Sequence, residues 1–292
     1  MKKASQSKSF LMAGGLGNQL FILTAGTYYS LKNKEHVTFD FSRYPNGIPP
    51  HGSDVRTLSP DAIFRYRPFR WFVKAGLNKV TNRALFPTYT SSGLGYDPGL
   101  ESHILENQIF GYFQTYKYLE QPQVRTFMGS LALSSVSEWF GKCSSDMLEL
   151  PTISVHIRRG DYMNSQDTFG VLSHEYYSSA IKFTLDHSSN RYARVLVFSD
   201  DIDSAKQLFS KLELSIPVQF AESPENYPEE TLILMSQSDA LVMSNSTFSW
   251  WAAQLGNESK FVVCPSKWFR GMLDPENLFP PEWHPQESRW EI

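Results

Sequence analysis

The sequence predicts an α/β protein with two domains. Its 292 residues suit two domains of roughly 150 residues better than one core. From residue 151 onward, apolar and β-branched runs alternate with segments of helical periodicity. Near the start, a strand runs into a glycine-rich turn, a helix and a second strand. We therefore expect one domain over 1–150 and another over 151–292.

In the first domain, the first 41 residues give clear secondary-structure predictions and the following residues do not. We predict strands over 9–13 and 36–41 and, between them, a helix over 19–33 with one face formed by Leu20, Leu23, Thr27 and Leu31. The segment 64–74, FRYRPFRWFVK, interleaves basic and aromatic residues. We favour an amphipathic surface helix there over a segment that lies against a membrane. Residues 103–115 are expected to include a strand.

The second domain alternates strictly between strands and helices. The predicted strands span 152–157, 193–199, 216–221, 239–244 and 260–265, and the predicted helices span 174–187, 201–212, 228–238 and 247–256. Continuous apolar runs are typical of parallel strands buried on both faces. The order predicts a doubly wound parallel sheet with right-handed crossovers.

Composition excludes several classes of protein. A net charge of −3 argues against a general nucleic-acid binder. The two cysteines form no C-x-x-C pair, and no apolar run reaches the ~20 residues of a membrane span. We expect a reducing, cytoplasmic setting. Residues 1–150 carry 16 basic and 11 acidic residues, which fits an anionic acceptor, a membrane surface, or merely uneven surface charge.

Polar residues follow three of the predicted strands directly. Ligands of such sheets bind beyond the carboxyl ends of the strands, so we expect these residues to converge. They are Arg158, Arg159 and Asp161 after the first strand, Asp200 and Asp201 after the second, and Asn245, Ser246 and Thr247 after the fourth.

An arginine pair near a helix N-terminus suits a diphosphate. Guanidinium groups bind phosphate oxygens with two hydrogen bonds, and the helix dipole favours negative charge. Each motif also has a plainer interpretation. The arginines can form structural ion pairs with Asp161 or another carboxylate, and the SNST and FSDD motifs can simply cap helices.

Two further motifs give weaker signals. The DID sequence at 201–203 resembles a divalent-metal site, but a capping aspartate explains it, and we expect no metal. The GGLGNQ turn lacks the third glycine of the dinucleotide fingerprint. A tight turn explains it, although Gly15 and Gly17 permit close backbone approach to a ligand, and Asn18 and Gln19 offer amide groups.

Together the motifs resemble a known family. GGLGNQLF (14–21), VHIRRGDY (155–162), VFSDD (197–201) and SNSTFSWWAA (244–253) occur in the order and at the spacing of the bacterial α-1,2-fucosyltransferases of glycosyltransferase family 11. The resemblance implies a two-lobed glycosyltransferase B-type fold with two Rossmann-like lobes and an active cleft between them. It also implies GDP-β-L-fucose as donor, the 2-hydroxyl of a terminal galactose as acceptor, inversion at the anomeric carbon and no metal.

The resemblance also implies roles for single residues. Arg158 would stabilise the charge on the departing β-phosphate, supported by His156 and Arg159. Asn18 would contact the donor near the reacting carbon, and the FSDD and SNST motifs would hold the nucleotide and diphosphate. Asp161 is a candidate base, or it orients the arginines.

The sequence leaves three alternative functions open. They are a nucleotide-sugar transferase that forms another linkage, a non-catalytic carbohydrate-binding protein, and an oxidoreductase. The intact arginine pair argues against the second, and the failed glycine pattern argues against the third. The expected setting is surface glycan or O-antigen synthesis on a lipid-linked acceptor, with possible peripheral contact at the inner membrane face.

Overall fold

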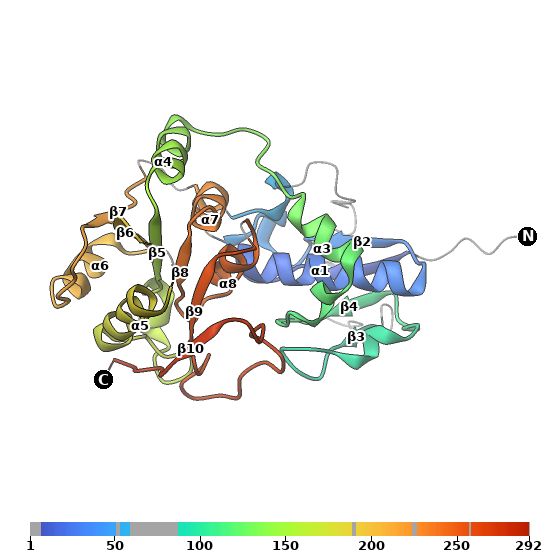
Figure 1. Ribbon diagram of the computed structural model, residues 1–292. Helices are drawn as coiled ribbons and strands as arrows, with labels where there is room; N and C mark the ends of the chain where they lie inside the picture. The colour runs from blue at the N-terminus through green and yellow to red at the C-terminus, as the bar shows by residue number, and fades with distance from the viewer. Residues whose placement is uncertain are drawn as a thin grey trace, which may run out of the picture. The chain divides into compact units, whose positions relative to one another are not determined.

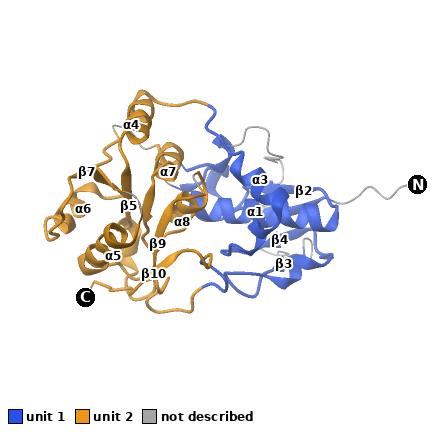
Figure 2. Ribbon diagram, viewed as in Figure 1, with its two compact units in different colours: residues 1–134, 275–279 blue, residues 135–274, 280–292 orange. Residues whose placement is uncertain are grey.

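The computed structural model describes residues 7–50, 53–58, 87–188, 191–223, 227–256 and 258–291. The chain divides into two compact units, residues 1–134 with 275–279 and residues 135–274 with 280–292 (Figure 2). The second unit thus begins before the expected boundary at residue 151, because it includes helix α4 (Glu138–Glu149). That helix is anchored to α7 (Pro228–Ser236), where the Glu230 carboxylate accepts hydrogen bonds from Ser137 N and Oγ at 2.7 and 2.6 Å.

The first unit is built on a parallel sheet. Among the described residues the strand order is β2-β1-β4-β3, with β1 (Lys8–Leu11), β2 (Val37–Asp40), β3 (Thr88–Thr90) and β4 (Gln108–Phe110). Helix α1 (Leu16–Asn33) connects β1 to β2, and α3 (Pro122–Gly129) packs against it. Short 3-10 helices span Pro45–Gly47, Val55–Thr57, Pro98–Glu101 and Lys117–Glu120.

Helix α1 differs from the amphipathic helix that the sequence predicts. It begins at Leu16, and nearly every residue through Gly26 is buried, so its first turns have no solvent face. Leu31, expected on the apolar face, is 44% exposed near the end of the helix. The expected face therefore extends too far along the chain, because the buried contacts of α1 end before its last turn.

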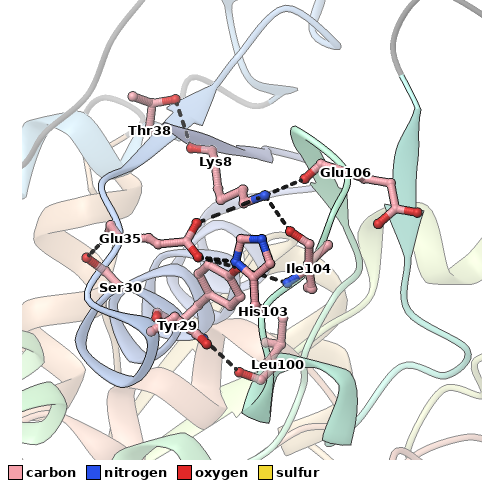
Figure 3. A network of polar contacts seen from close by, with 10 residues as sticks. Lys8, Tyr29, Ser30, Glu35, Thr38, Leu100, His103, Ile104 and Glu106 are labelled. Atoms are coloured by element: carbon pink, nitrogen blue, oxygen red, sulfur yellow. Dashed lines mark hydrogen bonds and ion pairs between the residues drawn. The ribbon is translucent and has the colours of Figure 1, made fainter. Parts of the chain in front are cut away.

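A buried lysine fixes the segment before β4 to β1 (Figure 3). Lys8 Nζ donates to the carbonyl oxygens of Ile104 and Glu106, and it lies 4.0 Å from Glu35 Oε2. His103 contacts the same carboxylate. A lysine that is 3% exposed must have such partners, because burying an unpaired charge is costly. The network thereby sets where β4 begins.

The second unit contains a larger parallel sheet (Figure 1). Its strand order in the described residues is β10-β9-β8-β5-β6-β7. The strands are β5 (Thr152–Ile157), β6 (Arg194–Ser199), β7 (Val218–Phe220), β8 (Ala240–Val242), β9 (Phe261–Pro265) and β10 (His284–Gln286). The doubly wound sheet predicted from the sequence is confirmed, and β5 has the predicted bounds. β10 was not predicted.

Helices cover this sheet. Helix α5 (His174–His187) packs against β8, β9 and β10, whereas α7 packs against both α4 and α8 (Thr247–Gln254). Helix α6 (Ile202–Phe209) packs against β6, and a 3-10 helix spans Gly160–Asn164. The core between the sheet and α5 includes Ile153, Val155, Ile157, Tyr176 and Tyr177.

Two observations bear on the membrane hypothesis. Within the described ranges, no helix is both long enough and apolar enough to cross a membrane. The basic aromatic segment 64–74, expected as an amphipathic helix, lies outside the described residues.

Candidate functional site

The strand order of the second unit locates its ligand site. From β5 the chain moves outward through β6 and β7, and it then returns to β8 on the other side of β5. The direction of winding therefore reverses between β5 and β8. In open α/β sheets, ligands bind beyond the carboxyl ends of the strands at such a reversal. Arg158 follows β5, and Ser246, which caps α8, lies in the turn between β8 and α8, so two of the predicted motifs meet there.

Alternation along β5 sends His156 and Ile157 to different faces of the sheet, and the two arginines that follow the strand have different partners. Ile157 points into the core under α5, whereas His156 contacts Phe248 of α8, with ring centroids 5.5 Å apart. Successive side chains on a strand point to opposite faces. Beyond the end of the strand, Arg158 pairs with Asp161 and Asp200, whereas Arg159 pairs with Glu291. The two arginines, expected to act as one pair, thus have different ion-pair partners.

Arg158 lies between two carboxylates and an aromatic ring. Its Nη2 atom is 2.5 Å from Asp161 Oδ1, and its Nη1 atom is 3.0 Å from Asp200 Oδ2. The guanidinium carbon lies 5.5 Å from the centre of the Tyr162 ring, a cation–π distance. The side chain is 22% exposed. Arg158 is thus held in place and remains accessible to an anion.

Tyr162 links this arginine to the start of α8. Its hydroxyl donates to Asn245 O at 3.2 Å, and its ring stacks on Phe169 at a centroid distance of 5.0 Å. Tyr162 was quoted in the VHIRRGDY motif but given no role. The signal was its position four residues after Arg158, in a turn that brings the ring under the guanidinium group.

Asp200 organises the backbone of the turn after β5. Its Oδ1 atom accepts a hydrogen bond from Arg159 N at 2.9 Å, while Oδ2 pairs with Arg158. A Cβ atom on Gly160 would lie 2.4 Å from Asp200 Oδ2. Glycine is therefore needed at 160 for this carboxylate to approach the turn.

Arg159 forms an ion pair with the C-terminal segment. Its Nη1 atom lies 2.5 Å from Glu291 Oε1, and the Arg159 side chain is 12% exposed. Residues 289–291 run beside 171–173, where Ser173 N donates to Arg289 O at 2.8 Å and Glu291 N donates to Val171 O at 2.7 Å. Arg159 therefore fastens this segment to β5. Sequence reasoning missed Glu291, because nothing in its surroundings in the chain marks it as a partner.

His156 is a neutral buried group beneath Arg158. Its Nδ1 atom is 2.8 Å from Ser244 Oγ, and its side chain is almost fully buried. Burial, assisted by the charge of Arg158, lowers the pKa of His156 to about 3. The imidazole is therefore uncharged near neutral pH and hydrogen-bonds β5 to Ser244 in the turn after β8.

The other predicted donor-binding residues of this unit have mainly structural contacts. Asn245 is buried, and its Nδ2 atom lies within 3.2 Å of the carbonyl oxygens of Phe169, Gly170 and Trp268. Asp201 caps α6, accepting hydrogen bonds from Ser204 N at 3.0 Å and Ser204 Oγ at 2.6 Å, which lower the pKa of its carboxyl group. Both residues shape the edge of the sheet through contacts with the protein itself.

Ser246 and Thr247 form the start of α8. Ser246 Oγ accepts a hydrogen bond from Phe248 N at 3.3 Å, so the helix-capping interpretation is correct. Thr247 is the first helical residue and is half-buried. The positive end of the helix dipole thus lies at the same reversal point as Arg158.

The glycine turn belongs to the first unit. Gly14 has φ +73°, and a Cβ atom there would lie 2.4 Å from Asn18 Nδ2. Gly15 caps α1, and Gly17 is buried in its first turn. Gln19 is fully buried, and its amide bonds to Gly14 O at 3.3 Å, Ser53 O at 3.0 Å and Val55 N at 3.0 Å. Gln19 therefore shapes the turn, while Asn18 is half-buried at its edge.

A metal site requires several acidic, histidine or cysteine side chains close together. Within the described ranges, no group of three or more His, Cys, Asp or Glu side chains is placed to hold a metal ion. A metal-free reaction remains a prediction.

Comparison with known proteins identifies the family. The family model for glycosyl transferase family 11 matches residues 100–287, well over half of the chain. This chain belongs to that family. The protein is therefore a glycosyltransferase, and the resemblance of its motifs to family 11 is confirmed.

Three named proteins are similar to this chain. An alpha-1,2-colitosyltransferase of Escherichia coli is 27% identical over 290 residues, covering 93% of this chain and 96% of the relative. The O-antigen biosynthesis glycosyltransferase WbnK of Escherichia coli is 38% identical over 124 residues, covering 41% of this chain and 40% of the relative. A galactoside alpha-(1,2)-fucosyltransferase 1 of Plecturocebus brunneus is 27% identical over 197 residues, 62% of this chain and 48% of the relative.

Solved structures confirm the fold. NodZ alpha-1,6-fucosyltransferase, soaked with GDP-fucose, matches with a TM-score of 0.51 at 12% identity over 86% of this chain and 93% of its own. A variant of Arabidopsis thaliana FUT1 in complex with GDP matches with a TM-score of 0.53 at 12% identity over 92% of this chain and 72% of its own. The fold is the glycosyltransferase B type, as predicted.

Proposed function

We propose that this family 11 glycosyltransferase transfers L-fucose from GDP-β-L-fucose to the 2-hydroxyl group of a terminal galactose, with inversion at the anomeric carbon and without a metal. The observation that carries the proposal is Arg158, a partly exposed guanidinium that follows β5 at the reversal point of the sheet and lies on Tyr162, whose hydroxyl donates to Asn245 just before α8. This arrangement suits a nucleotide diphosphate. The name of the Plecturocebus brunneus relative and the GDP-fucose in NodZ support the linkage and the donor.

In the proposed mechanism, the fucose–phosphate bond breaks and negative charge grows on the β-phosphate. Arg158 stabilises this charge with hydrogen bonds that strengthen as the bond lengthens. Asp161 and Asp200 hold the guanidinium group in a fixed direction before the donor binds. Because Asp161 forms an ion pair with Arg158, its contacts support a role in orienting the guanidinium group more than a role as the general base. Asn18 of the glycine turn contacts the donor sugar.

Colitose is a second candidate for the transferred sugar. The Escherichia coli relative named for colitose transfer aligns with 93% of this chain, more than the other two relatives reported. Colitose lacks the 3-hydroxyl group of fucose. A site that hydrogen-bonds this hydroxyl would reject the deoxy sugar strongly, whereas an apolar site would accept both sugars with similar rates. The two donors therefore distinguish the candidates.

The test is a transfer assay with GDP-fucose and GDP-colitose in separate reactions, lactose as acceptor, and EDTA throughout. GDP release gives the rate, and linkage analysis gives the position of the new bond. Fucosylation at the galactose 2-hydroxyl in EDTA would support the donor, the linkage and metal independence together. Transfer from GDP-colitose and not from GDP-fucose would show that colitose is the transferred sugar. Absence of transfer, hydrolysis and binding with both donors would reject the proposed function.

We also propose that the natural acceptor is a lipid-linked glycan used in surface polysaccharide or O-antigen synthesis at the inner membrane face. The net charge of +5 over residues 1–150, from 16 basic and 11 acidic residues, fits an anionic lipid surface. The name of the WbnK relative agrees with such a setting. Co-sedimentation with vesicles that contain an anionic lipid, compared with neutral vesicles, tests this contact.

A further inference from the structure

Two side-chain amides meet at the carboxyl edge of the first sheet. Gln114, shortly after β4, donates from Nε2 to Asn18 Oδ1 at 2.9 Å. An asparagine amide has one accepting end and one donating end. Since Gln114 engages the oxygen, the orientation of Asn18 is fixed and its Nδ2 donor is turned the other way, over Gly14.

Gln114 lowers the stability of the folded protein at this position. Its side chain is 6% exposed, and among the residues that the structure describes its Oε1 atom has no hydrogen-bond partner. A buried acceptor without a partner loses its hydration and gains nothing in return. An apolar side chain of similar size would avoid this cost. The glutamine therefore contributes something other than stability.

The backbone next to Gln114 is also strained. Phe113 has φ +52°, in the left-handed region that bulky L residues avoid. The turn is held by Gln114 N donating to Leu94 O at 2.6 Å and Thr115 N donating to Phe113 O at 2.8 Å. Strain of this kind persists where the surroundings enforce it, and it collects at functional sites. Here it accompanies the residue that contacts Asn18.

We infer that Gln114 is a positioning residue, which holds the Asn18 amide so that its Nδ2 donor, and not its oxygen, faces the substrate. The inference rests on the proposed function, in which Asn18 contacts the donor sugar. A hydroxyl or ring oxygen of the sugar is then the acceptor for Asn18 Nδ2. Gln114 itself need not touch the substrate, which agrees with its burial.

The decisive variant is Gln114→Glu, which preserves size and shape. A carboxylate only accepts hydrogen bonds, so Asn18 must rotate its amide and donate Nδ2 to residue 114. The oxygen of Asn18 would then face the sugar in place of the donor. We expect kcat/KM for transfer from GDP-fucose to fall by roughly 10- to 100-fold at pH 8, the usual effect of an unmatched hydrogen-bonding group. Gln123→Glu, an exposed glutamine of the same unit, is the matched control and should stay within twofold of wild type.

Acid pH provides the readout that a merely structural role would not change. The introduced carboxyl group gains a proton as the pH falls, and burial makes this easier by raising its pKa. A protonated carboxyl group can donate to Asn18 Oδ1 as the glutamine does. The activity ratio of Gln114→Glu to wild type should therefore rise between pH 8 and pH 5.5. A constant ratio, or activity within twofold of wild type at pH 8, would overturn the inference.

A measurement without substrate separates this inference from the proposed function. Protein labelled with ¹⁵N-asparagine gives side-chain NH₂ signals, and Asn18→Ala identifies the signal of residue 18. In Gln114→Glu at pH 8 the Asn18 NH₂ group should exchange with solvent at least tenfold more slowly than in wild type, because it is then hydrogen-bonded. Unchanged exchange would overturn the inference even if transfer is observed. If wild type transfers no fucose but slower exchange is seen, only the proposed function has failed.

Discussion

The carboxyl edges of the two sheets carry different chemistry. In the second unit, the residues after β5 and β6 form a charged cluster in which Arg158 and Arg159 pair with Asp161, Asp200 and Glu291. In the first unit, the residues after β1 and β4 present a glycine turn and the uncharged amides of Asn18, Gln19 and Gln114.

The contrast suggests a division of labour between the two edges. Hydrogen bonds that involve a charged group contribute about 1.5–3 kcal/mol, compared with about 0.5–1.5 kcal/mol for neutral pairs. A charged edge therefore suits a diphosphate, which brings charge of its own. Neutral amides suit sugar oxygens, because a hydrogen bond to an uncharged oxygen would not offset the free energy needed to desolvate a charged side chain. Changes at the charged edge should accordingly have the larger effects.

The largest expected effect is that of Arg158→Ala on catalysis. Loss of the guanidinium group removes stabilisation of the charge on the leaving phosphate, so kcat should fall by ~10²–10³. The measurement is steady-state GDP release at saturating donor. Arg289→Ala, which removes an exposed arginine that pairs with Glu287, is the matched control and should leave kcat within twofold. Equal losses in both variants would remove the special role of Arg158.

His156 should make stability depend on pH. Its pKa is about 3 in the folded protein and about 6.5 when unfolded, so the unfolded chain binds more protons between these values. Above pH 6.5 the imidazole is neutral in both the folded and the unfolded chain, so its protonation does not change the free energy of unfolding. As the pH falls from 6.5 towards 3, the unfolded chain takes up the proton first, and the free energy of unfolding decreases. Between pH 7 and pH 5, urea unfolding of wild type should lose about 2 kcal/mol more than that of His156→Asn. Parallel pH profiles for the two proteins would contradict the burial of a neutral histidine.

The Arg159–Glu291 pair should affect stability more than catalysis. Arg159 is mostly buried and Glu291 is partly exposed, so we expect Glu291→Gln to lower the free energy of unfolding by about 1–2 kcal/mol, less than for a fully buried pair. Chemical unfolding of the single and double variants with Arg159→Gln gives the coupling between them. Additive losses would show that the pair does not hold the C-terminal segment.

The smallest effect is expected at the neutral edge. Asn18→Ala removes one uncharged hydrogen bond to the sugar, so kcat/KM for GDP-fucose should fall by about tenfold. Raising the salt concentration should weaken donor binding by wild type and by Asn18→Ala in parallel, because the charged edge is intact in both. A loss in Asn18→Ala as large as that in Arg158→Ala would break the contrast between the edges.

Much of the second unit was predictable from the sequence, and less of the first. Strand β5 and helix α5 have the predicted bounds, because buried parallel strands and amphipathic helices leave strong periodic signals. Helix α4 was missed because only Phe140 and Met147 on it are buried, which leaves a faint apolar pattern. Strand β10 was missed because it is three residues long and contains a proline.

The candidate site was predictable in composition but not in detail. Strand order brings the residues after β5, β6 and β8 together, as the sequence implied. Sequence alone did not show that Arg159 pairs with Glu291 near the C-terminal end of the chain. It also did not show that the Asn245 amide donates to three backbone carbonyl oxygens. Such contacts depend on packing between distant segments, which local patterns do not encode.

The most direct test of the contrast is a calorimetric titration of GDP into wild type, Arg158→Ala and Asn18→Ala. GDP carries the diphosphate without the transferred fucose, so it should report on the charged edge alone. The account predicts that Arg158→Ala weakens GDP binding by roughly 10- to 100-fold, the value of a charge-assisted hydrogen bond, while Asn18→Ala binds GDP within twofold of wild type. Unchanged affinity in Arg158→Ala, or a comparable loss in Asn18→Ala, would contradict the assignment of the diphosphate to the second unit.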